Sequence, residues 1–294
     1  MKNTSYHLIR NALGYFEIEP KPTPKELKNH YQKKYYQYDS GNYSQNYSNE
    51  EIQYFKVEAK LAEATIKRYG DIKKSLLDIG CGEGFFSRYF HEKGWNIKCV
   101  DYSKAGIEKH NPSLLEFFKQ DDIISYIDKV KFDKTEYGLL NLDNVLEHVL
   151  NPVELLQSMK KIMTKTTIAR IEVPNDFSSF QKLLVTLNCT KETWISPPEH
   201  LNYFNHDSII STLESVGFEI LSLQADYPIE QFLLNDNSNY WKKRELGRAA
   251  HLSRVICTNY LSEKNIEKYI DFRSVSAELE FGRLLTAYVR LRKQ

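Results

Sequence analysis

The chain has 294 residues, of which 41% are hydrophobic and 27% charged, a composition typical of an ordinary globular protein and not of a disordered or fibrous one. Its 40 lysines and arginines against 39 aspartates and glutamates give a net charge of +1, which argues against nucleic acid or an anionic membrane as a partner. No apolar run is long enough to span a bilayer, and the first residues lack a cleavable leader, so we expect a cytoplasmic protein.

The first 70 residues predict an N-terminal helical arm or lid. Residues 1–22 show no regular pattern and predict an irregular stretch, whereas Thr23-Pro24-Lys25-Glu26 has the residues of a capping box at the start of a helix. A polar, tyrosine-rich loop over 38–47 precedes a second predicted helix over 48–69. The tyrosines could form a half-exposed surface or a lid that closes over a ligand, and both interpretations stay open.

Strands and helices alternate from residue 74 onward, and this alternation predicts a parallel sheet covered by helices. The predicted strands lie at 75–79, 96–101, 115–119, 137–142, 167–173 and 218–223, and the clearest helices at 83–93, 151–163 and 207–216. A charged, mostly helical insertion over 226–280 precedes a last strand over 283–291. We therefore expect a core of residues 71–225 plus 281–294, with 226–280 as a helical cap.

A glycine-rich turn follows the first of these strands. The buried strand Leu76-Leu77-Asp78-Ile79 leads into Gly80-Cys81-Gly82-Glu83-Gly84 and then into a helix with apolar spacing. Glycines let the backbone approach a ligand closely, and the start of a helix offers N–H groups to an anionic one. A dinucleotide site would need its third glycine at position 85, which is Phe85, so the spacing favours a different nucleoside ligand.

The pattern D-x-G-x-G-x-G over 78–84 resembles motif I of the class I S-adenosylmethionine-dependent methyltransferases. The segment 143–152 follows the fourth strand and resembles the V-L-E-H-V segment that many small-molecule methyltransferases carry there. The resemblance covers residues 74–225 and the last strand. It implies an α/β fold with a Rossmann-like, doubly wound, seven-stranded and mostly parallel sheet whose last strand is antiparallel, and S-adenosyl-L-methionine as the cofactor.

Aspartates at the ends of the next strands are candidates for holding this cofactor. Asp101 ends the second strand, where a carboxylate can accept both ribose hydroxyls of a nucleoside, although it could instead cap the following helix. The resemblance places the adenine amine on Asp122 or on its neighbour Asp121, and either could equally begin a helix. The residues expected at the cofactor are Asp78, Gly80, Cys81, Gly82, Gly84, Phe85, Asp101, Tyr102, Asp121, Asp122, Asp143 and Asn144.

Two histidines are candidate catalytic bases. His148 follows the fourth strand and His200 follows the fifth, and the ordinary pKa of an imidazole suits removal of a hydroxyl proton near neutral pH. Both could instead hold their loops by hydrogen bonds. The residues expected to bind the substrate are Glu147, Asn175, Asn202 and Tyr203. Asp143, Asn175 and Asp176 offer oxygen ligands for magnesium, but we expect no metal because the histidines suffice for acid–base chemistry.

The segments around these residues are similar to bacterial methyltransferases of surface-polysaccharide and other small-molecule biosynthesis. The resemblance therefore implies an enzyme that methylates a hydroxyl of a sugar or related metabolite in bacterial glycan biosynthesis. Three alternatives stay open: N- or C-methylation of a small molecule, a NAD-dependent oxidoreductase, which Phe85 argues against, and a non-catalytic scaffold that binds the cofactor. We expect a small-molecule substrate, no nucleic acid and no membrane span, and the sequence is compatible with a homo-oligomer.

Overall fold

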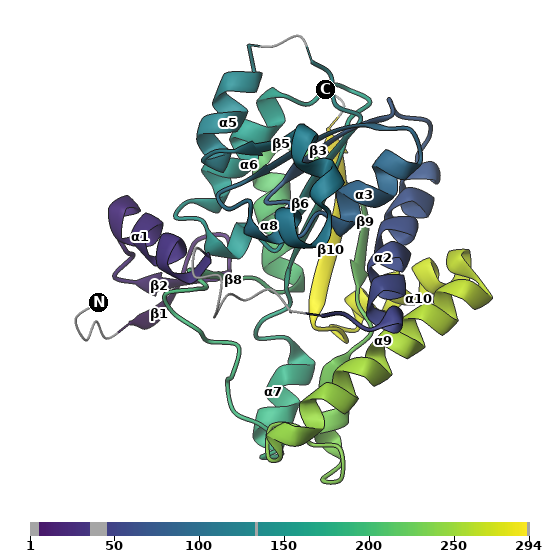
Figure 1. Ribbon diagram of the computed structural model, residues 1–294. Helices are drawn as coiled ribbons and strands as arrows, with labels where there is room; N and C mark the ends of the chain where they lie inside the picture. Colours follow the sequence, from purple (N-terminus) through teal and green to yellow (C-terminus); the bar gives the residue numbers. More distant parts are fainter. Residues whose placement is uncertain (1–5, 36–45, 133–134, 293–294) are drawn as a thin grey trace.

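The structure, a computed structural model, describes residues 6–35, 46–132 and 135–292 (Figure 1). Its centre is a seven-stranded sheet in the order β5-β4-β3-β6-β7-β10-β9. The strands are β3 (Ser75–Ile79), β4 (Asn96–Asp101), β5 (Phe118–Gln120), β6 (Leu139–Asp143), β7 (Ile168–Pro174), β9 (Phe218–Ala225) and β10 (Leu284–Leu291). The strands from β5 to β7 pair in parallel, and β10 pairs antiparallel with both β7 and β9. The predicted Rossmann-like α/β sheet with an antiparallel last strand is confirmed.

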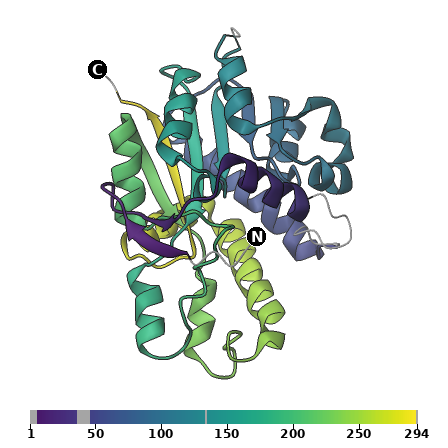
Figure 2. The same cartoon turned by 90° about the vertical axis from the view of Figure 1, so that its left-hand side faces the viewer.

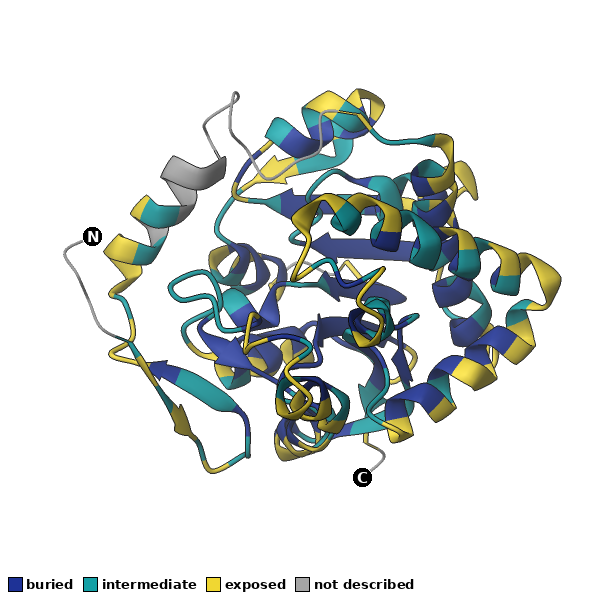
Figure 3. Ribbon diagram, turned by 90° about the horizontal axis from the view of Figure 1, so that it is seen from below, coloured by how far each residue is buried: buried dark blue, intermediate teal, exposed yellow. Residues whose placement is uncertain are grey.

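Helices cover both faces of this sheet, so the sheet is doubly wound. One face carries α2 (Asn49–Lys67), α3 (Phe85–Glu92) and α4 (Ala105–His110), and the other α5 (Ile123–Val130), α6 (Pro152–Lys161) and α8 (His206–Val216). In α2, Ala59, Ala62 and Ile66 pack in one cluster with Leu76 of β3 and Phe90 of α3. Figure 3 shows the strands buried at the centre and the outer helix faces exposed. Coverage of both faces explains why every residue of β3 and β7 is buried and why most of them are apolar.

The N-terminal segment forms a second, three-stranded sheet, so the prediction that residues 1–22 are irregular was wrong. Strand β1 (His7–Arg10) pairs with β2 (Phe16–Glu19), and β2 pairs with β8 (Asn202–Tyr203). Helix α1 (Pro24–Tyr35) follows, and the predicted capping box is present because Thr23 and Glu26 exchange hydrogen bonds. Figure 2 shows this hairpin and α1 in front of the large sheet.

A helical region lies below the sheet in Figure 1, next to α2. It consists of α7 (Ser179–Thr186), the short helices η3 (Ile229–Leu234) and η4 (Arg244–Leu246), α9 (Gly247–Lys264) and α10 (Ile266–Glu278). Two ion pairs of 2.8 Å, Arg68–Glu267 and Arg273–Glu58, join α10 to α2 and its end. The stretch between β9 and β10 is therefore packed onto the core.

Two further sequence predictions concern the third strand of the sheet and the tyrosine-rich loop. The third strand was predicted at 115–119, but Pro112–Phe117 form the short helix η1 and the strand begins at Phe118. Pro112 favours this helix start, because its ring fixes φ and its missing N–H is not needed there. The tyrosine-rich loop lies outside the described residues except for its last two positions. Within the described ranges, no helix combines the length and the apolar character needed to cross a bilayer.

Candidate active site

The glycine-rich turn joins β3 to α3 and forms one wall of the site. Gly80, Gly82 and Gly84 have φ values of 76°, 52° and 78°, which side chains other than glycine rarely adopt. At Gly80 a Cβ atom would also lie 2.4 Å from Cγ2 of Val145, in the segment that follows β6. Position 80 therefore needs glycine for both its conformation and its space, and the two motifs found in the sequence lie against each other.

Asp78 lies beneath this turn and not on its surface. Its side chain is 1% exposed and accepts hydrogen bonds from Ser87 of α3 (2.6 Å) and Asn141 of β6 (2.8 Å). Burial raises the pKa of its carboxyl to about 6. In this position Asp78 joins β3 to α3 and β6, and its contact with the cofactor stays a prediction.

Asp101 is fixed beside the turn at the end of β4. Its carboxylate accepts hydrogen bonds from the N–H groups of Gly82 (2.9 Å) and Ser103 (3.0 Å), and burial raises its pKa. Of the two candidates for the adenine amine, Asp122 caps α5 and contacts the Tyr102 hydroxyl, whereas Asp121 pairs with Lys129 at 2.7 Å. The alternative that one of these two aspartates begins a helix is therefore true of Asp122. Asp122 also lies at the same edge of the sheet as Asp101 and Tyr102.

Two of the residues predicted at the cofactor pack against their neighbours. Phe85 stacks on Phe55 of α2 with ring centroids 4.5 Å apart. Cys81 is half-buried against the apolar cluster that includes Cys99. Their side chains therefore help to fix the turn and the start of α3.

A buried arginine that the sequence analysis missed organises the ends of β6 and β7. Arg170 is 2% exposed and binds the carboxylates of Asp143 (2.9 Å) and Glu172 (2.6 Å). Asn144, predicted together with Asp143 at the cofactor, donates to Asp143 at 2.7 Å and has a positive φ of 50°. A charged residue inside the apolar strand Ile168–Pro174 was the signal that could have revealed Arg170, because buried charges need partners.

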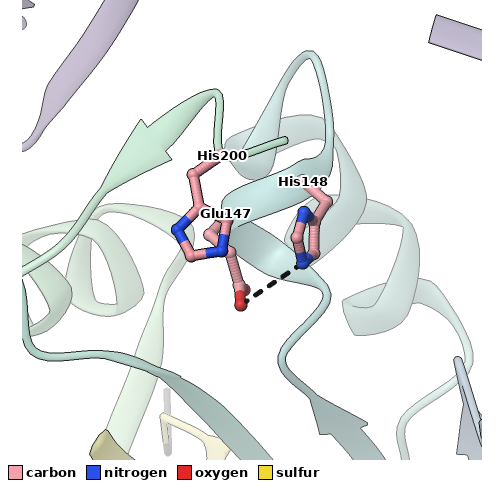
Figure 4. A group of neighbouring side chains, drawn as sticks. All are labelled: Glu147, His148 and His200. Atoms are coloured by element: carbon pink, nitrogen blue, oxygen red, sulfur yellow. Dashed lines mark ion pairs between the residues drawn. The ribbon is translucent and has the colours of Figure 1, made fainter. Parts of the chain in front are cut away.

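The two predicted bases come together with Glu147 (Figure 4). Glu147 and His148 lie on η2 (Leu146–His148), and Nε2 of His148 is 3.6 Å from Oε1 of Glu147. The rings of His148 and His200 have centroids 4.9 Å apart. The loop of His200 is held there because the N–H of Leu201 donates to the carbonyl of Glu147 at 2.8 Å. Residues far apart in the chain thus form one cluster, which we call the Glu147–His148–His200 cluster.

Three of the predicted substrate-binding residues support this arrangement from inside the protein. Asn202 is fully buried and donates to the carbonyl of Val149 (2.7 Å), and the buried Tyr203 hydroxyl donates to the carbonyl of His200 (3.0 Å). Asn175 is fully buried and donates to the carbonyl of Gly282 (3.0 Å). Their side chains hold loops in place, and direct contact of these three residues with the substrate stays a prediction.

Glu147 gives the cluster its electrostatic character. Burial raises the pKa of Glu147 well above its usual range, and the neighbouring carboxylates of Asp176 and Asp143 raise it further. Its Oε2 atom is buried and has no hydrogen-bond partner among the described residues. A buried carboxylate in this position favours positive charge beside it, either a protonated histidine or a cation.

The cluster also has the composition of a metal site. Glu147, His148 and His200 each offer one ligand atom, and the three atoms lie within 4.8 Å of one another. One carboxylate and two imidazoles are the ligands of many catalytic divalent cations, with a further position left for substrate or water. Two of the carboxylates that the sequence offered as magnesium ligands are instead paired with arginines, because Arg170 binds Asp143 and Arg283 binds Asp176.

The fold and the turn define an α/β protein with a site for a nucleoside-type ligand at the ends of its parallel strands. The sequence model of the methyltransferase domain family matches residues 51–223, more than half of the chain, and the chain belongs to this family. It is an S-adenosylmethionine-dependent methyltransferase with the class I fold, and its cofactor is S-adenosyl-L-methionine. The residues present fit that cofactor, since the turn has no room for a Cβ at Gly80 and Asp101 is fixed beside it.

Individual relatives agree with this assignment. The chain is 24% identical over 189 residues to the ubiquinone biosynthesis O-methyltransferase of Rickettsia canadensis, covering 60% of this chain and 78% of that protein. Its fold is similar to that of the plantazolicin methyltransferase BpumL in complex with a monoazolic desmethylPZN analog and SAH, with a TM-score of 0.54, 16% identity and coverage of 92% and 97%. It is also similar to the 1,6-didemethyltoxoflavin-N1-methyltransferase of Burkholderia thailandensis, with a TM-score of 0.51, 12% identity and coverage of 99% and 100%.

Proposed function

We propose that the chain transfers the methyl group to a hydroxyl oxygen of a small molecule, a sugar or related metabolite of bacterial glycan biosynthesis. The observation that carries the proposal is the Glu147–His148–His200 cluster, because a hydroxyl acceptor must lose a proton and an amine acceptor need not. The Rickettsia relative is an O-methyltransferase by name, which supports the same acceptor atom. That name also makes an intermediate of ubiquinone biosynthesis the second candidate acceptor.

The cofactor residues have the following proposed roles. The turn from Gly80 to Gly84 and the start of α3 receive the amino-acid end, Asp101 accepts the ribose hydroxyls, and the Tyr102–Asp122 pair lies at the adenine side. When bound, the cofactor supplies an electrophilic methyl group on its sulfonium. The chain's own residues then have to align the acceptor with that methyl group and exclude water, which is where most of the rate enhancement arises.

His148 is the proposed base. Its Nδ1 atom lies 2.7 Å from the carbonyl oxygen of Glu199. A carbonyl oxygen can only accept, so Nδ1 carries the ring hydrogen and the lone pair is on Nε2. Nε2 takes the proton of the acceptor hydroxyl, and Glu147, whose Oε1 lies 3.6 Å from Nε2, is the acidic group beside the imidazolium that results. His200, across the same space, is proposed to position the acceptor oxygen and is the alternative base.

The test measures methyl transfer and cofactor binding separately. Purified chain is incubated with methyl-labelled cofactor and a panel of sugar nucleotides, free sugars and hydroxylated intermediates of ubiquinone biosynthesis, and products are identified by mass. His148→Ala is expected to lower kcat by about 10²–10⁴-fold, with the affinity for S-adenosylhomocysteine unchanged. Asp101→Ala is expected to abolish that binding. His7→Ala, which changes an exposed histidine of the hairpin, is the control and keeps full activity.

Three outcomes would change the proposal. Full activity in both His148→Ala and His200→Ala would remove the catalytic base. Activity that disappears with a chelator and returns with one divalent cation would make the cluster a cation site in place of a base. Methylation of an intermediate of ubiquinone biosynthesis, with none of any sugar, would contradict the sugar acceptor and leave O-methylation standing.

A further inference from the structure

A cavity lies beside α7, between the loop before β8 and the segment that follows β9. Its volume is about 170 Å³, enough for more than a single water molecule. Three aromatic rings and three polar side chains give it its character: Trp194, Tyr240, Trp241, Gln181, Glu230 and Arg283. Aromatic walls with a few placed polar groups are typical of sites for small organic ligands.

Three of these residues carry a buried polar atom that has no hydrogen-bond partner in the described ranges. These atoms are Nε1 of Trp194, Oε1 of Gln181 and Oε2 of Glu230, and all three residues are more than nine-tenths buried. Unpaired polar atoms are costly in a protein interior, and three around one cavity are unusual. The set consists of one donor and two acceptors, so it matches a ligand that offers both kinds of group.

The polar groups are held in place before any ligand arrives. The side-chain amide of Gln181 donates to Oε1 of Glu230 at 2.9 Å, and Arg283 lies 3.6 Å from the same oxygen. The side chain of Asn239 donates to the carbonyls of Cys189 and Leu233, both at 2.8 Å, and so ties the two loops together. A preformed site loses less free energy on binding than a flexible one.

The cavity is adjacent to the end of the sheet where the Glu147–His148–His200 cluster lies. Arg283 also binds Asp176, which follows β7, at 3.2 Å, and the Asp176 carboxylate raises the pKa of Glu147. Trp194 packs edge-on against Phe177, with ring centroids 5.5 Å apart. One group of an acceptor could therefore occupy the cavity while another part of the same molecule reaches the cluster.

We propose that this cavity binds a neutral polyhydroxylated group, a sugar ring, of the methyl acceptor, and this inference rests on the proposed function. Hydroxyl groups donate to Gln181 and Glu230 and accept from Trp194, and the C–H face of a sugar ring packs on the aromatic walls. The carboxylates of Glu230 and Asp176 disfavour a phosphate or carboxylate ligand, because the one guanidinium of Arg283 pairs with both of them.

The test measures binding directly and needs no methyl transfer. The full chain with S-adenosylhomocysteine is titrated with the methyl glycosides of glucose, galactose, mannose and rhamnose, and with glucose 6-phosphate, using saturation-transfer NMR. At least one neutral glycoside is expected to bind. Trp194→Phe removes the N–H and keeps an aromatic ring, and it should raise the Kd at least about tenfold. Gln181→Met tests the acceptor side in the same way.

Trp95→Phe is the matched control, because Trp95 is a buried tryptophan far from this cavity in the cluster under α2 and α3, and it should change the Kd less than twofold. The absence of binding by every neutral glycoside would mean that the cavity holds water alone and would overturn the proposal. An unchanged Kd in both Trp194→Phe and Gln181→Met, or tighter binding of glucose 6-phosphate, would overturn it as well. Sugar binding without methyl transfer to any sugar of the activity panel would keep the cavity as a sugar site and contradict the proposed sugar acceptor.

Discussion

Asp78 shows at the scale of one residue how the turn is held from below. Its carboxyl has two hydrogen-bond donors, Ser87 and Asn141, but burial still raises its pKa from 3.8 to about 6. The folded protein therefore binds this proton more tightly than the unfolded chain does. The free energy of unfolding falls as pH rises from about 4 to about 6, and above that window the ionised form remains costly.

Asp78→Asn is expected to remove this pH dependence. An asparagine has the same shape, and it can accept from Asn141 and donate to Ser87. Above pH 7 the variant should be more stable than the unmodified protein by up to about 3 kcal/mol, and near pH 4 the two should be similar. Urea unfolding of both proteins from pH 4 to pH 8 gives the comparison. A difference in stability that stays constant across this range would contradict the assigned pKa.

Arg170 is the second residue whose role depends on burial. It compensates Asp143 and Glu172, so Arg170→Met leaves two carboxylates without their partner. Breaking such a buried pair should lower the free energy of unfolding by roughly 3–5 kcal/mol. Arg290→Met is the control, because the Arg290–Glu219 pair at 2.8 Å is partly exposed and should contribute at most about 1 kcal/mol. Equal losses in chemical denaturation of the two variants would show that Arg170 is not a buried charge in solution.

At the scale of elements, the turn between β3 and α3 shows two distinct reasons why a position requires glycine, its backbone conformation and the space around it. Gly80 and Gly94 have the same φ of 76°, but a Cβ at Gly80 would meet Val145 at 2.4 Å and one at Gly94 would meet nothing within 4 Å. Gly94→Ala should thus lower stability by about 1–3 kcal/mol through backbone strain alone and leave cofactor binding intact.

Gly80→Ala should cost more, because it adds the clash with Val145 to the same strain, and it should also weaken binding of S-adenosylhomocysteine. Thermal unfolding and calorimetric titration of both variants test this pair. Equal losses of stability and of affinity in the two variants would show that the fit of the turn against the segment after β6 does not matter.

The elements that the sequence predicted well are those that depend on local pattern. The mainly apolar strands β3 and β7 and the glycines after β3 are visible over a few residues, and with the family resemblance they were enough to predict a mostly parallel sheet and the cofactor. Strands β1 and β2 have only four residues each, and β2 is completed by the distant β8, so no local pattern marks them.

The same distinction between local pattern and long-range contact applies to the residues of the site. His148 and His200 were recognised from their places after strands, and the structure brings their rings together. Asn202 and Tyr203 were assigned to the substrate because their segment is rich in polar groups, but their burial depends on how that segment folds back on η2. Burial and long-range contacts of this kind cannot be read from the spacing of residues along the chain.

At the scale of the whole molecule, the proposed acceptor region is assembled from parts that lie far apart in the sequence. The loop of His200 leads into β8, which pairs with the N-terminal hairpin, and the cavity beside α7 is closed by residues that follow β9. The stretch between β9 and β10 is in turn fixed to α2 by the ion pairs of Arg68, Glu58 and Glu51. We therefore expect contacts with α2 to control how firmly this helical region is held.

Glu51 is the residue that tests this idea. It is buried, it completes the capping box at the start of α2, and its carboxylate accepts from Arg248 and His251 of α9. The Arg248 guanidinium lowers its pKa to about 2, so the carboxylate is charged throughout the physiological range.

Glu51→Gln keeps the side-chain oxygen of the capping box and removes the charge, and it should lower the free energy of unfolding by about 1–3 kcal/mol. Hydrogen exchange should rise in α9 while β3 and β6 stay protected. Glu267→Gln, at an exposed pair with Arg68, is the control and should change α9 little. Unchanged exchange in α9 of Glu51→Gln would mean that apolar packing alone holds this region on the core.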